Sequence, residues 1–229
     1  MITIHNIPPK AASHKILFIS GIDTNVGKTY ATAALANTFL KKGYKTITQK
    51  MIQTGNRGIS EDIEKHRELM GIPLLPADKE GLTCPVILSY PASPHLAAEI
   101  DNTVIDLQCI DEATRKLSLE YDRILLEGAG GLMVPLYASG NNPLGGYLTV
   151  DYIAERQYPV VLVTSGKLGS LNHTLLSIDA CIRRDIPIEM IIYNMYPNED
   201  AVITESSLKY LRNTGIPVVI LPTAMAAAI

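Results

Sequence analysis

A glycine-bounded loop between a predicted strand and a predicted helix limits the folds open to this chain. The loop, Gly21-Ile-Asp-Thr-Asn-Val-Gly27-Lys28-Thr29, follows the β-branched run at residues 15–20 and precedes an alanine-rich helical pattern. In such a unit the backbone N–H groups and the helix N-terminus face phosphate oxygens. A lysine neutralises the β- and γ-phosphates, and a threonine hydroxyl ligates Mg²⁺. The pattern predicts these two roles for Lys28 and Thr29.

The loop is longer than the common pattern, which has four residues between its glycines. The alternative is an ordinary strand-to-helix turn that happens to contain Lys-Thr. This alternative is disfavoured, because the strand before the loop and the helix after it lie where phosphate binding requires them.

Short β-branched runs alternate with helical patterns along the rest of the chain. The predicted strands cover residues 15–20, 46–51, 123–127, 160–164, 190–193 and 218–221. Their nearly continuous hydrophobicity is typical of parallel strands covered on both faces. Helical spacing of apolar residues appears at 107–117 and 171–182, and Gly43 and Gly215 are expected to end helices. The expected fold is α/β, with a single doubly wound, mostly parallel sheet flanked by helices.

The sequence shows no internal repeat, linker or domain boundary. We expect residues 1–14 to form an N-terminal extension and residues 15–229 to form one domain. Residues 85–94 are the most irregular stretch, and residues 139–146 are expected to form a flexible loop. The hydrophobic fraction of 47% is sufficient for a buried core.

The charge balance argues against nucleic-acid and membrane partners. The formal net charge is −3, without the basic patch that such surfaces need. Apolar runs fall short of the ~20 residues that span a bilayer. Cys84, Cys109 and Cys181 lack metal-binding spacing and are expected to be reduced, buried thiols of a cytoplasmic protein. His66 and the other scattered histidines are expected to be surface or core residues rather than metal ligands.

Two further residues suit a site beside the phosphate loop. Glu127 closes a predicted strand and precedes glycines that allow a ligand to approach closely. It is therefore expected to be a second Mg²⁺ ligand rather than a strand cap. Lys50 ends another strand at the same edge. Alone it would be a solvated edge charge, but beside a phosphate loop it is expected to clamp the transferred phosphate.

Six segments, in order and at compatible spacings, resemble those of the dethiobiotin synthetases, ATP-dependent enzymes of the biotin pathway. They are residues 21–29, 49–55, 60–62, 91–95, 127–131 and 167–173. The chain departs from the family at two positions. Met51 stands where the family has proline, and Met195 stands where the family has an acid after the asparagine. Partition and septum-site ATPases share the expected fold, but they carry a second lysine early in the loop that is absent here.

The resemblance implies an ATP- and Mg²⁺-dependent reaction. CO₂, supplied as bicarbonate, and 7,8-diaminopelargonate would close a ureido ring to give dethiobiotin, ADP and phosphate. It also implies a homodimer in which the substrate carboxylate reaches the partner subunit, where the helix start at 169–172 would bind an anion.

The resemblance also assigns site residues. The implied catalytic residues are Lys28 and Lys50. The implied ATP-binding residues are Asn25, Val26, Gly27, Lys28, Thr29, Tyr30, Asp62, Glu127, Gly128, Ala129, Gly130, Asn194 and Pro222. The implied substrate-binding residues are Thr24, Thr54, Ser93 and Asn172. The implied metal ligands are Thr29, Asp62 and Glu127.

Two of these assignments leave alternatives open. Asp62 lies in an acidic helix start that Ser60 would cap, and Glu61 or Glu64 could take its role as a metal ligand. The Asn194 amide is expected to pair with adenine and to favour ATP over GTP. Alternatively, Asn194 only terminates its strand and the base contacts come from the region of Pro222.

Three other functions compete with ring closure. An ATP-switched partition protein would turn over ATP without a diamino acid. A cobyrinate-type amidotransferase would need a glutaminase domain, for which this chain has no length. A nucleotide-binding regulator without chemistry would not need Lys50 and Glu127.

Overall fold

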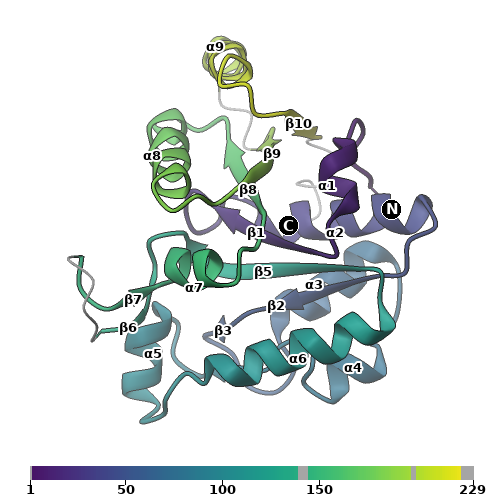
Figure 1. The fold of residues 1–229 in the computed structure, drawn as a ribbon, viewed down its shortest axis with the longest axis vertical. Helices are drawn as coiled ribbons and strands as arrows, with labels where there is room; N and C mark the ends of the chain where they lie inside the picture. The colour runs from purple at the N-terminus through teal and green to yellow at the C-terminus, as the bar shows by residue number, and fades with distance from the viewer. Residues whose placement is uncertain (1, 139–143, 197–199, 223–229) are drawn as a thin grey trace.

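The centre of the protein is a six-stranded sheet in the order β10-β9-β8-β1-β5-β2. We describe a computed structural model, which covers residues 2–138, 144–196 and 200–222. All neighbouring strands in this sheet run parallel (Figure 1), as the continuous hydrophobic runs predict. The strands are β1 (Ile16–Gly21), β2 (Thr46–Lys50), β5 (Arg123–Gly131), β8 (Val160–Ser165), β9 (Ile188–Asn194) and β10 (Val218–Leu221).

Helices cover both faces of the sheet, which confirms the doubly wound α/β fold. Leu17 and Ile19 of β1 pack with α2 (Lys28–Lys41), whereas the intervening Phe18 belongs to the core on the opposite face. That opposite core includes residues of α6 (Leu107–Glu120), α7 (Thr149–Glu155) and α8 (Ser170–Ile182). Successive side chains of a strand point to opposite faces, so each central strand contributes to both cores.

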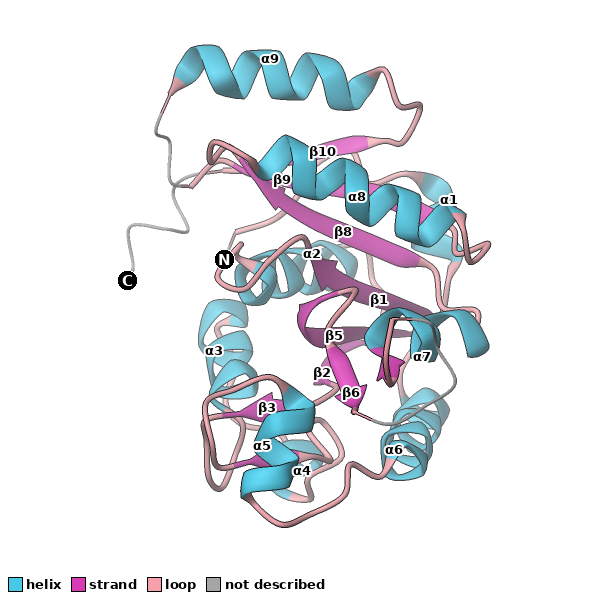
Figure 2. Ribbon diagram, turned by 90° about the vertical axis from the view of Figure 1, so that its left-hand side faces the viewer, coloured by secondary structure: helices cyan, strands magenta, loops and turns pink. Residues whose placement is uncertain are grey.

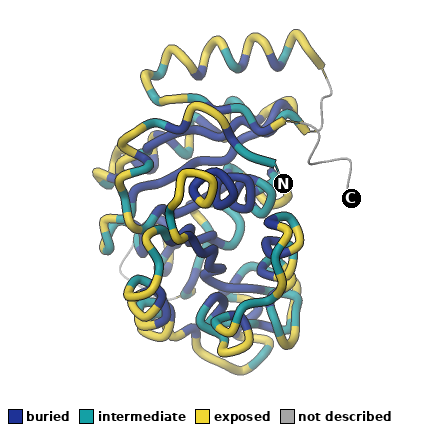
Figure 3. The backbone as a smooth tube through the Cα atoms, turned by 90° about the vertical axis from the view of Figure 1, so that its right-hand side faces the viewer, coloured by how far each residue is buried: buried dark blue, intermediate teal, exposed yellow. Residues whose placement is uncertain are grey.

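The remaining elements are short or peripheral. They are α1 (Pro9–Ser13), β3 (Gln53–Thr54), α3 (Glu61–Met70), α4 (Pro76–Lys79), β4 (Ile87–Leu88), α5 (Pro94–Ile100), β6 (Pro135–Tyr137), β7 (Tyr147–Leu148) and α9 (Ala201–Arg212). The outermost helix is α9 (Figure 2), and most of its residues are exposed, in contrast to the buried central strands (Figure 3).

Two local expectations differ from the structure. The strand β5 continues past Glu127 to Gly131, which still pairs with Gly21 of β1. Glu127 therefore lies inside a strand rather than at its end. The segment 85–94, expected to be irregular, contains β4, which pairs in parallel with β3. In the expected flexible loop at 139–146, residues 139–143 lie outside the described residues.

The helix after the phosphate loop is almost entirely buried. Alanine favours helix formation, and the alanines of α2 allow the helix to lie close to the sheet. The N-terminal segment covers α2: the Ile4 N–H donates to Thr38 Oγ1 at 2.8 Å, and Asn37 Nδ2 donates to Ile2 O at 3.2 Å. The start of this segment, at Ile2 and Ile4, therefore packs against the helix that begins at the phosphate loop, whereas Lys10 and His14 contact Glu189 of β9.

The prediction of three buried thiols is wrong for one of them. Cys84 and Cys181 are buried, and burial raises the pKa of their thiols to about 11 and about 12. Cys109 is exposed, because α6 turns its apolar face, with Ile110, toward the sheet. Within the described residues, no helix has the length and apolarity needed to span a membrane.

Candidate active site

The phosphate loop lies at the carboxyl edge of the central sheet, between β1 and α2. Asn25 and Gly27 have left-handed backbone angles, with φ of 58° and 95°. Gly27 directly precedes the first residue of α2, so the free N–H groups at the start of this helix face the cleft. This geometry suits the binding of an anion.

Lys28 is held inside the loop. It is buried, and its Nζ donates to the carbonyl oxygen of Asp23 at 3.0 Å. Burial lowers the pKa of Lys28 to about 8, although Glu127 partly opposes this shift. Phosphate oxygens would favour the charged form, so the loop is arranged for an anionic ligand.

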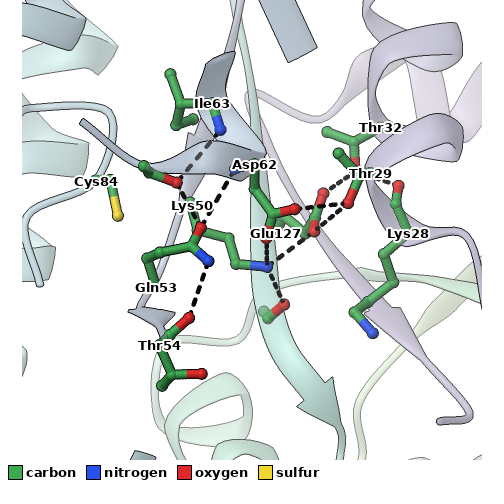
Figure 4. Close-up of polar contacts among 12 residues, drawn as sticks. Lys28, Thr29, Thr32, Lys50, Gln53, Thr54, Asp62, Ile63, Cys84 and Glu127 are labelled. Carbon is green, nitrogen blue, oxygen red and sulfur yellow. Dashed lines mark hydrogen bonds and ion pairs between the residues drawn. The ribbon is translucent and has the colours of Figure 1, made fainter. Parts of the chain in front are cut away.

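Three side-chain oxygens meet beside Lys28, from elements far apart in the sequence (Figure 4). Thr29 Oγ1 donates to Asp62 Oδ1 at 3.0 Å and lies 3.4 Å from Glu127 Oε1. The described residues contain no group of three or more Asp, Glu, His or Cys side chains that could hold a metal alone. A hydroxyl and two carboxylates nevertheless fit Mg²⁺, which takes oxygen ligands and completes its shell with water and phosphate oxygens.

Lys50 lies between the two carboxylates and is buried, so it is not the solvated edge charge considered above. Its Nζ is 2.9 Å from Glu127 Oε1 and 2.5 Å from Asp62 Oδ2, and it donates to Gly128 O at 3.2 Å. Burial disfavours the ammonium, but Glu127 and Asp62 outweigh that effect and raise the pKa of Lys50 above its usual value. Lys50 is therefore charged and ion-paired at the edge where β2 ends.

The start of α3 places Asp62 in this cluster. Ser60 caps the helix, since its Oγ accepts from the Ile63 N–H at 3.3 Å, as the sequence predicted. Gln53 Oε1 accepts from Ser60 Oγ at 2.6 Å and from the Asp62 N–H at 3.3 Å. Glu61 and Glu64, the alternatives to Asp62, are both exposed. Of these acids, Asp62 is the one that reaches Thr29.

The sequence did not reveal three of the polar residues that shape the site: Gln53, Thr32 and His66. Thr32 Oγ1 donates to Glu127 Oε2 at 2.8 Å, and His66 Nε2 lies 2.9 Å from the same oxygen. The available signal was helical spacing, because Thr32 and His66 lie about one turn after Thr29 and Asp62. Burial acts to raise the pKa of Glu127, but Lys50, His66 and Lys28 outweigh it and hold this pKa well below its usual value.

A cleft of about 610 Å³ joins these groups, and it contains most of the predicted site residues. Its lining comprises Thr24, Asn25, Gly27, Lys28, Thr29, Tyr30, Lys50, Ile52, Gln53, Thr54, Asp62, Glu127, Ala129, Gly130, Asn194, Tyr196 and Leu221. A neighbouring hollow of about 450 Å³ shares Thr24, Thr54, Ala129 and Gly130 with the cleft and adds Ser93. The predicted phosphate and substrate residues therefore line adjoining spaces.

Four predicted residues line neither the cleft nor the neighbouring hollow. Val26 is buried beneath the loop, and Gly128 lies within β5 against Phe18. Pro222 is exposed directly after Leu221, and Asn172 is exposed at the start of α8, outside both hollows.

Asn194 has a structural contact that the sequence did not predict. Its Nδ2 donates to Val26 O at 3.0 Å, and its Oδ1 accepts from the Tyr196 N–H at 3.1 Å. The amide lies so close to Gly27 that a Cβ at this glycine would collide with Nδ2. Asn194 thus links the end of β9 to the phosphate loop.

Comparison with known proteins gives consistent matches. A family model described as an AAA domain matches residues 15–221. The chain is 52% identical over 198 residues to ATP-dependent dethiobiotin synthetase BioD 2 of Haemophilus ducreyi, and 48% identical over 198 residues to the protein of the same name from Pasteurella multocida. Each alignment covers 86% of this chain and 90% of the relative. The solved MinC:MinD cell division protein complex of Aquifex aeolicus matches with a TM-score of 0.50 at 18% identity, over 91% of this chain and 81% of that chain, a likeness of fold alone.

Proposed function

The chain belongs to the dethiobiotin synthetase family and is an ATP-dependent ligase of biotin biosynthesis, and from this premise we propose how its cleft closes a ureido ring on 7,8-diaminopelargonate. The observation that carries the proposal is the meeting of Lys28, Lys50 and the Thr29–Asp62–Glu127 oxygens at the edge of the sheet. ATP would lie along the phosphate loop, with its γ-phosphate toward the hollow that shares Thr24 and Thr54.

The reaction proceeds through the substrate's own groups. One amine attacks CO₂ and loses a proton to give a carbamate. A carbamate oxygen then attacks the γ-phosphorus. The bond between the γ-phosphorus and the oxygen that leaves with ADP breaks, and a mixed carbamic–phosphoric anhydride forms. The second amine attacks the carbonyl carbon, phosphate leaves, and the amine loses a proton. No covalent enzyme nucleophile is needed, so catalysis rests on positioning and charge neutralisation.

The lysines and the hydroxyl side chains of the cleft have separate roles in this reaction. Lys28 neutralises the β- and γ-phosphates, and Lys50 neutralises the transferred phosphoryl group and the carbamate. Thr24 and Thr54 hold the carbamate and amine end, and Ser93 lines the remainder of the substrate space. These contacts stabilise charge that develops in the transition state, where preorganised groups are most effective.

Thr29, Asp62 and Glu127 would hold Mg²⁺. Bound Mg²⁺ would neutralise negative charge on the phosphates of ATP. Asp62→Asn is expected to raise the Mg²⁺ concentration needed for half-maximal turnover, whereas Glu61→Gln, at the adjacent exposed acid, leaves it unchanged. If the Mg²⁺ titration of Asp62→Asn matches that of the wild type, Asp62 is not a metal ligand and only favours the start of its helix.

We further propose that the protein acts as a cytoplasmic homodimer, without nucleic-acid or membrane partners. The net charge of −3 supports the lack of nucleic-acid and membrane partners, and the free thiols of the three cysteines support the cytoplasm. The homodimer rests on the family resemblance. In the homodimer, Asn172 at the start of α8 would contact the carboxylate of a substrate bound mainly to the other subunit, which accounts for its distance from the cleft of its own chain.

One assay tests the reaction. ADP release is measured with and without 7,8-diaminopelargonate and bicarbonate, for the wild type and for Lys28→Ala. We expect ADP release to require both substrates and to be lost in Lys28→Ala. ADP release independent of the diamino acid would favour an ATP-switched partition protein instead.

A further inference from the structure

The two oxygens of the Glu127 carboxylate have different partners. Glu127 is fully buried, and its Oε2 contacts Thr32 Oγ1 at 2.8 Å and His66 Nε2 at 2.9 Å. Its Oε1 faces Lys50 and Thr29 on the side of the cleft. Two donors thus occupy one oxygen of Glu127, and the other oxygen remains on the side where phosphate and metal would bind.

His66 is an unusual residue for its position. Its ring is fully buried on α3, and among the described residues Glu127 is its one hydrogen-bond partner. The second ring nitrogen, Nδ1, is buried and has no hydrogen-bond partner in the part of the chain that the structure describes. A buried polar atom without a partner destabilises the folded protein, and an apolar side chain at this position would avoid that cost. Packing alone therefore does not explain the histidine, whereas the bond to Glu127 does.

The helix that carries His66 also carries Asp62, about one turn earlier. Gln53 fixes the start of this helix through Ser60 Oγ and the Asp62 N–H. The helix α3 therefore supplies the Asp62 carboxylate and, through His66, contacts the Glu127 carboxylate.

We propose that His66 is a positioning residue that fixes the rotation of the Glu127 carboxylate, so that Oε1 is held toward the metal. Nε2 is the nitrogen that faces the carboxylate, and a carboxylate oxygen only accepts, so the proton of this contact lies on Nε2. The inference rests on the proposed role of Glu127 as a Mg²⁺ ligand. Residues that orient metal ligands typically change metal affinity by about 10- to 100-fold when they are removed.

The test measures metal binding rather than turnover, with Mn²⁺ as the probe. Free Mn²⁺ is followed by electron paramagnetic resonance during titration of the full chain in the presence of ATP. We expect His66→Leu to weaken Mn²⁺ binding by about 10- to 100-fold. His66→Gln, whose amide N–H can replace Nε2–H, is expected to keep the affinity within about threefold, because the donor is retained. Met70→Leu, a volume-conserving change at a buried residue of α3 outside the cluster, serves as the matched control.

The outcomes separate this inference from the proposed function. If Glu127→Gln weakens Mn²⁺ binding but His66→Leu does not, the positioning role is wrong and the metal assignment stands. If Glu127→Gln binds Mn²⁺ like the wild type, the metal role of Glu127 is itself wrong. Equal losses in His66→Leu and His66→Gln would show that packing, not the hydrogen bond, is responsible. If His66→Leu does not fold, His66→Asn replaces it, since asparagine is too short to reach Oε2. Equal affinities of the asparagine and glutamine variants would then overturn the inference.

Discussion

Replacing Lys50 with methionine should make the stability of the protein depend on Mg²⁺. The substitution keeps most of the side-chain volume but removes the ammonium between Glu127 and Asp62. Removal of one partner from a buried ion pair typically costs about 3–5 kcal/mol. Glu127 keeps Thr32 and His66 as donors, so we expect a loss near the lower end, about 3 kcal/mol, without divalent cations.

Added Mg²⁺ should recover most of this loss. Without the ammonium, Asp62 and Glu127 bind a cation more tightly in the variant than in the wild type, where Lys50 already neutralises them. A ligand at 100 times its dissociation constant stabilises the folded state by about 2.7 kcal/mol. The free energy of unfolding is measured by urea titration in EDTA and in excess Mg²⁺, without nucleotide.

The comparison needs a lysine that lacks buried partners. Lys116 is exposed and lies 4.0 Å from Glu112, so Lys116→Met should leave the unfolding midpoint unchanged in both buffers. The reasoning is refuted if Lys50→Met is as stable as the wild type in EDTA, or if Mg²⁺ stabilises both proteins equally.

Further expectations follow from other buried contacts. Arg67→Met removes the bidentate partner of the buried Asp78 carboxylate and is expected to lower the free energy of unfolding by about 3–5 kcal/mol in a urea titration; an unchanged midpoint would contradict it. Asn194→Ala removes two hydrogen bonds of the amide that contacts the phosphate loop. At roughly 1 kcal/mol per bond, we expect it to weaken ATP, GTP and CTP binding alike, by several-fold to about 30-fold. A loss confined to ATP would instead assign the amide to adenine recognition. A coloured thiol reagent at pH 8 should modify Cys109 quickly in the native protein and the other two thiols only after denaturation; rapid modification of more than one thiol would contradict the burial described above.

Features that depend on residues close together in the sequence could be predicted. The phosphate loop, the six sheet strands and the Ser60 cap each have a local pattern, and the structure contains all of them, with β5 extended to Gly131. Parallel strands bring their carboxyl ends to one edge, so proximity of Lys50 and Glu127 could be inferred without a structure. The register that sets Lys50 opposite Glu127 agrees with that inference.

Features that depend on tertiary contacts could not be predicted. The sequence near Lys50 does not reveal that its ammonium is buried between two carboxylates, because a lysine that ends a strand is usually solvated. The sequence does not pair His66 with Glu127, because the two residues lie 61 positions apart. Cys109 is different, because the helical spacing of apolar residues at 107–117 already places it beside the face that packs on the sheet, so its exposure could be predicted from the sequence.

The strand order has a consequence for synthesis of the protein. The strand that precedes the phosphate loop is made first, but Ile16 pairs with Ile124 of β5, and Phe18 pairs with Val160 of β8. At roughly 5–20 residues per second, a ribosome needs about 5–20 s to add the hundred or so residues that separate β1 from its first neighbour. During this interval the apolar faces of β1 and the alanine-rich α2 lack the sheet that buries them, and unpaired strand edges favour aggregation. The early part of the nascent chain is therefore where a chaperone that shields apolar segments would bind.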